Sequence, residues 1–294
     1  GFVETDIFVS NKFAMKLGVR AENSSLIDDF TFSPRVSLAY KPGEKGQFSL
    51  AYGDFYQNPL TEVAKFGQAL GSEKTAHYLL NYQFLSDGKT FRAEAYYKDY
   101  NNLVKYDTQL PQFNSNFNNL GDGYAAGLDI FWSDNKSIEN LDYWISYSYL
   151  NTERDYRNFR ERATPNFAPE HNLSVVTKYW VDDLRSQLGF SYIYGSGRPY
   201  DNPNTEGFLA EKTKSFNSLN FNWAYLIDQQ KILYFSVNNV LGFNNIYNYQ
   251  YANTPNANGL FDRQAIRPAA DSFFFVGFFW TISTDKKCNQ LDNL

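Results

Sequence analysis

The chain has 294 residues, and its 27 basic and 32 acidic side chains give a formal net charge of -5. Charges of both signs are mixed along the chain, so no basic patch indicates binding to nucleic acid. Aromatic residues are frequent, with 27 Phe, 23 Tyr and 5 Trp. Because Tyr and Trp favour sites with one apolar and one wet end, this composition favours a large amphipathic surface over an ordinary soluble core.

Two further features narrow the class of protein. The longest apolar run, Phe273 to Trp280, is far shorter than the roughly 20 residues that a spanning helix needs, which excludes a helical membrane protein. A single cysteine, Cys288, excludes a disulfide framework and a cysteine-ligated metal site. The chain opens at Gly1 inside a strand-like run without an initiator Met or signal peptide, so we expect a processed chain or a fragment.

Strand-period alternation recurs from one end of the chain to the other. In the clearest segment, 218–225, Leu219, Phe221, Trp223 and Tyr225 alternate with Ser218, Asn220, Asn222 and Ala224. About thirteen such segments begin near residues 2, 12, 33, 46, 74, 90, 122, 141, 170, 185, 215, 231 and 273. One face of each strand is apolar and the other is polar, which predicts an all-β, transmembrane, antiparallel up-and-down β-barrel.

The predicted connections alternate strictly between short and long. The short ones are Ser10 to Asn11, Lys41 to Lys45, Ser86 to Lys89, Ser133 to Asn140, Val181 to Asp183 and Asp228 to Gln230. The long ones are Ala21 to Thr31, Phe55 to Glu73, Asn101 to Gly121, Asn151 to Pro169, Ser196 to Lys214 and Tyr249 to Asp271. Outer-membrane barrels show this alternation, with tight periplasmic turns and long extracellular loops.

The same alternation assigns the two ends of the chain. The last strand, Ser272 to Ile282, runs inward, so residues 1–282 form the C-terminal portion of the barrel and 283–294 a polar periplasmic tail. Bacterial barrels have an even number of strands, so thirteen cannot close alone. We therefore expect further strands before Gly1.

Several short runs together resemble one family. They are Ser33-Pro-Arg-Val-Ser-Leu-Ala-Tyr40, Ala51-Tyr-Gly-Asp-Phe-Tyr-Gln-Asn-Pro59, Phe91-Arg-Ala-Glu-Ala-Tyr-Tyr-Lys-Asp-Tyr100, Gly123-Tyr-Ala-Ala-Gly-Leu-Asp129, Ala168-Pro-Glu-His-Asn-Leu173, Gly195-Ser-Gly-Arg-Pro-Tyr200 and Val237-Asn-Asn-Val-Leu-Gly-Phe243. In this order they resemble the TonB-dependent outer-membrane receptors, in the branch with a carboxypeptidase-regulatory-like domain ahead of the plug.

The resemblance implies an activity and a set of partners. It implies the last thirteen of twenty-two strands, in the outer membrane of a Gram-negative bacterium, and TonB-energised uptake of an unidentified ligand. The plug and the TonB box would lie before Gly1, and the partners would be lipid, lipopolysaccharide, TonB and a surface or periplasmic accessory protein. A passive porin and an outer-membrane adhesin or scaffold remain as alternatives, because both would share the strand pattern.

The long loops hold the candidate ligand-binding residues. Arg154, Arg157, Arg160 and Arg162, interleaved with Tyr156 and Phe159, could bind an anion through spaced guanidinium groups. The favoured alternative is that these arginines pair with Glu153, Asp155 and Glu161 or with lipopolysaccharide. Tyr106, Phe117, Tyr200 and Tyr251 lie among loop asparagines, which suits a glycan or a peptide, although Asn, Gly and Pro are also ordinary loop formers.

Other constellations carry less information. His77 and His171 are the only histidines, and no motif places a nucleophile beside either, so we expect no enzyme; two histidines and one cysteine also make no metal site or cofactor site. The polar faces of the predicted strands supply candidate lumen- or plug-facing residues: Lys16, Arg20, Arg35, Arg92, Glu94 and Asp129. Inward polar residues are expected in any such barrel, so these support the fold more than a mechanism.

Overall fold

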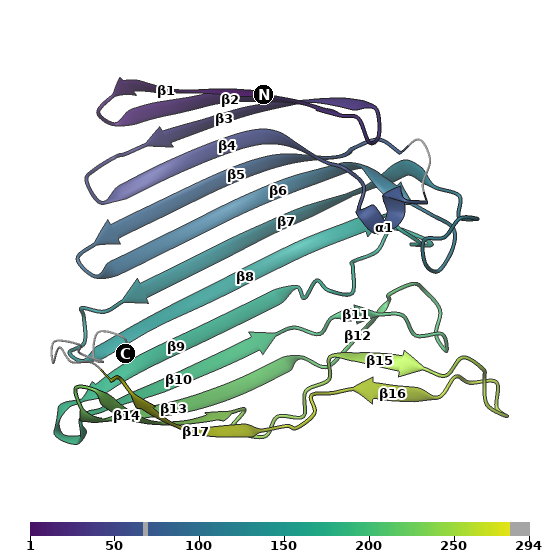
Figure 1. Cartoon of the computed structure of the whole chain (residues 1–294). Helices are drawn as coiled ribbons and strands as arrows, with labels where there is room; N and C mark the ends of the chain where they lie inside the picture. Colours follow the sequence, from purple (N-terminus) through teal and green to yellow (C-terminus); the bar gives the residue numbers. More distant parts are fainter. Residues whose placement is uncertain (67–69, 283–294) are drawn as a thin grey trace.

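The computed structural model describes residues 1–66 and 70–282, which form one thirteen-stranded antiparallel sheet (Figure 1). Its strands are β1 (Phe2–Ser10), β2 (Phe13–Ser24), β3 (Asp29–Tyr40), β4 (Gly46–Gln57), β5 (Glu73–Ser86), β6 (Lys89–Lys105), β7 (Asn118–Asp134), β8 (Leu141–Asp155), β9 (His171–Val181), β10 (Ser186–Gly195), β13 (Phe216–Asp228), β14 (Lys231–Asn238) and β17 (Phe273–Trp280). Each strand pairs with the sheet strand next in sequence. This order confirms the predicted up-and-down fold and the strand number.

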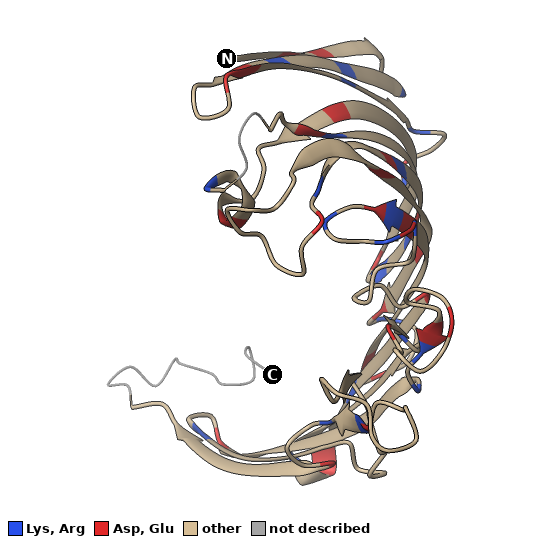
Figure 2. Ribbon diagram, turned by 90° about the vertical axis from the view of Figure 1, so that its right-hand side faces the viewer, with Lys and Arg blue, Asp and Glu red and all other residues tan. Residues whose placement is uncertain are grey.

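The sheet is strongly curved and open. Figure 2 shows it curling into a C-shaped trough, with β1 and β17 at the two rims. Each rim strand is paired on one side only, so its other side presents unpaired backbone N–H and C=O groups. The described residues therefore form part of a barrel wall.

Short turns lie at one end of the strands and long loops at the other (Figure 1). Five connections at this end are long. The connection 58–72 contains α1 (Thr61–Ala64), and 106–117 and 156–170 contain no helix or strand. The connection 196–215 contains β11 (Pro199–Tyr200) and β12 (Glu211–Lys212). The fifth, 239–272, holds the hairpin of β15 (Asn248–Tyr251) and β16 (Arg263–Ile266). The candidate ligand-binding residues all come from this end.

Two predicted connections are wrong. The long loop predicted to begin at Tyr249 begins at Asn239, because β14 ends at Asn238. The sequence pattern predicts a long loop from Ala21 to Thr31, but β2 and β3 stay paired up to Ser24 and Asp29, leaving only residues 25–28 as the turn. Polar residues such as Asn23 and Asp29 interrupt the apolar pattern, and this interruption predicts a loop. Backbone pairing does not need an uninterrupted pattern, and Phe30, which is 66% exposed, continues the outer face of β3 before its predicted start.

One face of the sheet carries two rows of aromatic side chains. The row nearer the short turns runs through Phe48, Tyr82, Phe91 and Trp132, with ring centroids 4.6, 6.1 and 6.4 Å apart. The row nearer the loops runs through Tyr52, Tyr78, Tyr97 and Tyr124, at 5.1, 6.3 and 6.3 Å. Register explains both rows, because these residues are direct cross-strand partners or one pair apart on the same face.

Aliphatic side chains fill the space between the two rows. Leu50 and Leu80 are paired across β4 and β5 and are 53% and 52% exposed. A large exposed apolar band between two aromatic girdles is the surface that a transmembrane β-barrel turns to lipid.

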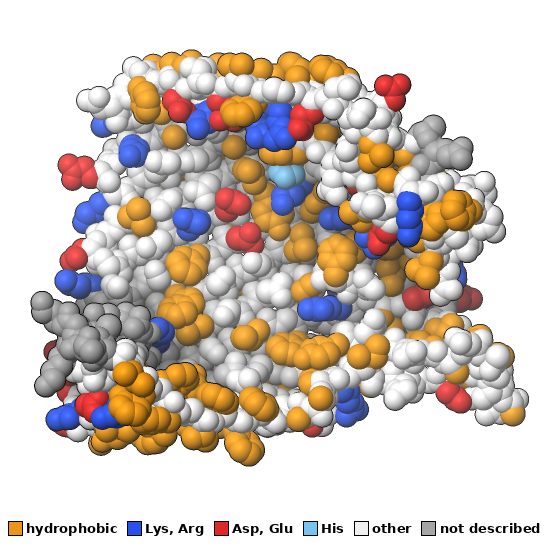
Figure 3. Space-filling model, viewed as in Figure 1, with side chains coloured by type: hydrophobic (Ala, Val, Ile, Leu, Met, Phe, Trp, Pro, Cys, Tyr) orange, Lys and Arg blue, Asp and Glu red, His pale blue; other side chains and the backbone are white. Residues whose placement is uncertain are grey.

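The opposite face is the concave one. Figure 3 looks onto it and shows Lys, Arg, Asp and Glu side chains among uncharged polar groups, with apolar side chains between them. Strand register places the six candidate lumen residues on one face, for example Arg92 opposite Gln83 and Glu94 opposite both Asn81 and Asp129. The alternation predicted from sequence thus sorts the side chains of each strand between two surfaces.

Within residues 1–66 and 70–282, no helix combines the length and the apolar character needed to cross a membrane. The expected periplasmic tail, 283–294, and Cys288 lie outside the described residues.

Candidate functional site

Three long loops join into one surface at the loop end of the sheet. In the loop 196–215, the Phe208 backbone N–H donates to Glu161 Oε1 at 3.1 Å, and the Phe208 ring lies 5.0 Å from Phe159 of the neighbouring loop. On its other side, Asn204 exchanges hydrogen bonds of 2.9 and 2.7 Å with the backbone of Phe261. The loop 196–215 therefore ties the loops 156–170 and 239–272 together.

Arg154 is held within the protein. Its guanidinium lies 4.3 Å from the centre of the Tyr100 ring and 5.6 Å from those of Tyr156 and Phe167. Its backbone exchanges two hydrogen bonds with Ala163. Such stacking suits a cation that fastens a loop to the sheet, because ring faces attract a guanidinium group.

The other arginines of this loop differ from one another. Arg157 adopts a positive φ of 53°, and its backbone bonds both Val104 and Tyr106, so it extends the pairing beyond β6. Arg160 is exposed. Arg162 forms an ion pair of 2.6 Å with Asp122.

The acidic partners expected from the sequence are different from those observed. Asp155 pairs with Lys105 of β6, and Glu161 accepts the Phe208 N–H. Sequence proximity misled the prediction, because the partners of these two carboxylates are residues distant in sequence, one on β6 and one in the loop 196–215.

Tyr106 and Phe117 belong to a small apolar cluster. Their rings are 5.9 Å apart and pack on Val63, Leu70 and Val104, beside α1. Burial raises the pKa of the Tyr106 hydroxyl. The two residues stabilise the loops 58–72 and 106–117 where they meet β6.

Tyr200 and Tyr251 lie where the two loop hairpins meet. Tyr200 is only 3% exposed, donates to Glu211 Oε2 at 2.9 Å and lies 4.7 Å from the Tyr249 ring. Burial, and then the Glu211 carboxylate, raise the pKa of Tyr200 to about 12. Arg263, the register partner of Tyr251, stacks on Tyr249 at 4.3 Å and donates to the Tyr200 hydroxyl at 3.3 Å. These contacts join β11–β12 to β15–β16.

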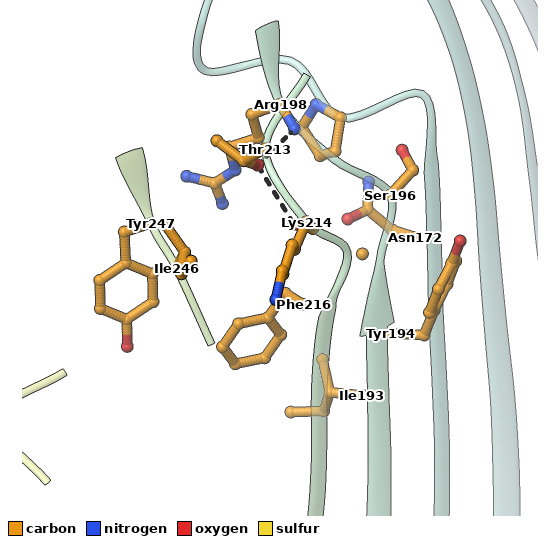
Figure 4. Close-up of a pocket in the computed structure, with 12 residues that line it drawn as sticks. Asn172, Ile193, Tyr194, Ser196, Arg198, Thr213, Lys214, Phe216, Ile246 and Tyr247 are labelled. Atoms are coloured by element: carbon orange, nitrogen blue, oxygen red, sulfur yellow. Dashed lines mark hydrogen bonds between the residues drawn. The ribbon is translucent and has the colours of Figure 1, made fainter. Parts of the chain in front are cut away.

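A cavity of about 250 Å³ lies at the loop ends of β9, β10 and β13 (Figure 4). Its lining includes Asn172, Ile193, Gly195, Arg198, Lys214, Phe216, Ile246 and Tyr247. Sequence patterns do not predict this site, because the residues named here come from three strands and from two connections that are far apart in the sequence. The Gly195 to Tyr200 run was noticed only as part of a family resemblance.

The two histidines lie on opposite faces of the sheet. His77 of β5 lies 4.4 Å from the Phe55 ring on the concave face, and Phe55 also stacks with Arg35. His171 of β9 bonds the Tyr147 hydroxyl through Nδ1 at 2.9 Å on the other face. Across residues 1–66 and 70–282, no group of three or more His, Cys, Asp or Glu side chains could hold a metal ion.

The comparisons agree with the geometry of the sheet. A family model described as TonB dependent receptor-like, beta-barrel matches residues 1–240. No curated protein matches the chain.

Three solved structures illustrate the similarity in fold. The siderophore receptor PiuA from Acinetobacter baumannii is 13% identical, with a TM-score of 0.71 over 95% of this chain and 42% of that one. The ferric-catecholate import receptor Fiu from E. coli K12 is 11% identical, with a TM-score of 0.69 over 95% and 44%. The copper transporter OprC is 14% identical, with a TM-score of 0.67 over 95% and 46%. The chain thus spans less than half the length of the structures that it matches.

Proposed function

We propose that the chain forms part of the wall and the loops of an outer-membrane receptor, which takes up a ligand with energy supplied through TonB. The premise is that the chain belongs to the TonB-dependent receptor-like β-barrel family. The observation that carries the proposal is the two-faced sheet. Its outer face has an apolar band between two aromatic rows, and its concave face is polar and charged. A wall of this kind separates lipid from an aqueous or protein-filled interior.

The proposal includes further parts of the molecule. The unpaired edges of β1 and β17, together with the 42–46% coverage of the three structures above, support a wall completed by other strands, since unpaired backbone groups are costly in lipid. We place a plug on the concave face, where Lys16, Arg20, Arg35, Arg92, Glu94 and Asp129 would contact it. A total of twenty-two strands stays a prediction.

The proposed location is the outer membrane of a Gram-negative bacterium. The aromatic rows would contact lipid, the exposed loop side chains lipopolysaccharide or an accessory protein, and TonB would act through parts outside these residues. We propose a transport role and no catalytic one.

The joined loops support ligand capture at the outer end of the wall. Among the residues predicted from sequence, Arg160 and Arg157 are exposed and would make the first contact with the ligand. Arg154, Tyr106, Phe117 and Tyr200 would act indirectly by holding the loops in place. Tyr251 would act with Arg263 at the junction of the hairpins.

Planar-bilayer recording of the full-length protein separates this function from a passive porin. A receptor with a plugged interior should insert without opening a stable channel, and should bind the purified periplasmic domain of TonB. A large, steady conductance together with no binding of TonB would favour the porin. A closed barrel that ignores TonB would favour an adhesin or a scaffold.

A further inference from the structure

The cavity at the loop ends of β9, β10 and β13 includes Asn172, Gly195 and Phe216, which share the concave face of the sheet. Register places Gly195 between Asn172 and Phe216, and the missing side chain of Gly195 leaves space between them. A Cβ atom there would meet Asn172 Oδ1 at 3.5 Å and the Phe216 Cβ at 3.8 Å, which are ordinary contacts. The cavity can therefore be narrowed from its floor without backbone strain.

The charges in the lining are all positive. Arg198 and Lys214 line the cavity, and no Asp or Glu does so among the described residues. Hydrogen bonds join the two segments that carry these cations: the Arg198 N–H donates to Thr213 Oγ1 at 3.0 Å, and the Thr213 N–H donates to the Arg198 carbonyl at 2.9 Å. Figure 4 shows both side chains at the cavity.

Neither cation is neutralised within residues 1–66 and 70–282, where neither forms an ion pair. Neighbouring cations behave differently. Lys212 pairs with Glu170 at 3.1 Å, and Arg162 pairs with Asp122. Both residues are exposed at the rim of the cavity. Two uncompensated cations at one cavity attract an anion, most strongly at low salt.

The other wall of the cavity is apolar and flat. The rings of Phe216 and Tyr247 lie 6.2 Å apart and are inclined by only 18°. Ile193 and Ile246 extend this surface, and the Asn172 amide adds a hydrogen-bonding group. A ligand with a planar apolar part would contact the rings while its charged end meets the cations.

We propose that this cavity binds a small organic anion, a carboxylate or phosphate attached to a flat apolar group. Arg198 and Lys214 bind the charge, and Phe216 and Tyr247 contact the apolar part. The inference rests on the proposed receptor function and names a ligand class for it.

The test uses the full-length protein in detergent at low salt, with benzoate and phenyl phosphate as probes and the neutral benzamide for comparison. Binding is followed by saturation-transfer NMR and titration. The two anions should bind the unaltered protein and benzamide should not. Replacement of both cations, R198A with K214A, should weaken anion binding about tenfold or more, because it removes the charge-assisted hydrogen bonds to the anion.

Two further variants test whether the cations and the space of this cavity are responsible for binding. The double variant K12A with K136A removes two cations from the turns at the opposite end of the wall and should bind both anions normally. Gly195→Leu keeps both cavity cations and fills the floor, so it should also weaken binding of both anions. Heat-modifiable migration of each variant in electrophoresis establishes that it is folded.

Several results would overturn the proposal. They are equal binding of benzoate and benzamide, no effect of R198A with K214A, and no binding by the unaltered protein, which is expected if an acidic plug side chain already occupies the cavity. Because these measurements need no TonB, their failure alongside normal TonB binding would remove the ligand assignment alone. A failure of TonB binding would remove the proposed function instead.

Discussion

The two faces of the sheet are built from the same strands but follow different rules. On the lipid-facing side, cross-strand partners repeat one chemistry, as in Tyr52, Tyr78 and Tyr97, and single residues are interchangeable if they stay apolar. On the concave side, particular partners matter, as where Tyr96 covers Gly127. Side chains of the outer face must therefore suit contact with lipid, whereas those of the inner face must fit particular neighbours. Substitutions should lower folding stability for different reasons on the two faces.

The largest expected effect comes from a charge on the outer face. Leu80 lies midway between the two aromatic rows, so Leu80→Arg places a guanidinium near the middle of the bilayer. We expect a loss of about 2–4 kcal/mol in folding stability. Urea titration of the full-length protein in lipid vesicles measures the change.

The adjacent residue provides the control. Asn81 points to the concave face, where it donates to Glu94 at 3.4 Å, so Asn81→Arg adds the same group beside a carboxylate. Its folding stability should change by less than about 1 kcal/mol. If the two variants were equally destabilised, the assignment of the faces would be wrong.

A steric substitution tests the inner face. A Cβ on Gly127 would lie 2.3 Å from the Tyr96 ring and 2.7 Å from the Tyr149 carbonyl oxygen. Gly127→Val should therefore cost about 1–3 kcal/mol in the same titration. Gly195→Ala, whose Cβ would have ordinary contacts, should stay within about 0.5 kcal/mol of the unaltered protein. Equal losses for the two variants would show that the close contact at Gly127 does not determine stability.

A smaller effect is expected where the wall meets the loops. Arg154→Ala removes the cation above Tyr100 and should release the loop 156–170, with a loss of about 0.5–2 kcal/mol. Limited proteolysis should cut that loop faster than in the unaltered protein. Arg160→Ala, at an exposed position of the same loop, should leave the cutting rate unchanged. Faster proteolysis in the Arg160 variant alone would mean that Arg160, and not Arg154, holds the loop 156–170 in place.

The smallest effect concerns the pH response of a loop. Asp107 accepts hydrogen bonds from the backbone and side chain of Asn116, and these bonds lower the pKa of the Asp107 carboxyl. The stabilisation is present above the unfolded pKa of about 3.9 and is lost as pH falls through the lowered value. Hydrogen exchange of residues 107–117 should therefore respond to acid more in the unaltered protein than in Asp107→Asn. An identical acid response in both would contradict this account.

The sequence predicts the wall well and the loops poorly. Alternation in segments such as 218–225 gave the faces, and the thirteen predicted starts lie within four residues of those observed. The alternation with a period of two involves only neighbouring residues, so it can be recognised without knowledge of the fold. The largest shifts, 33 to 29 and 122 to 118, occur at the loop ends of β3 and β7, where polar residues interrupt the alternation.

The loop contacts depend on residues that are distant in sequence. Arg154 stacks on Tyr100, Tyr200 bonds Arg263, and the cavity joins Asn172 to Tyr247. No rule of sequence spacing predicts contacts between residues so far apart in the chain. The sequence shows that the loops contain aromatic and arginine residues, but their packing depends on partners that are distant in sequence.

The most direct test of the central claim is electrophoresis of outer-membrane fractions, with and without boiling, followed by immunoblotting against the exposed loop 253–262. If the chain is part of the wall of a larger receptor, the antibody should detect a heat-modifiable band far above 34.0 kDa. A heat-modifiable band at 34.0 kDa would mean a small self-sufficient barrel, and a band that does not shift on boiling would contradict a membrane barrel altogether.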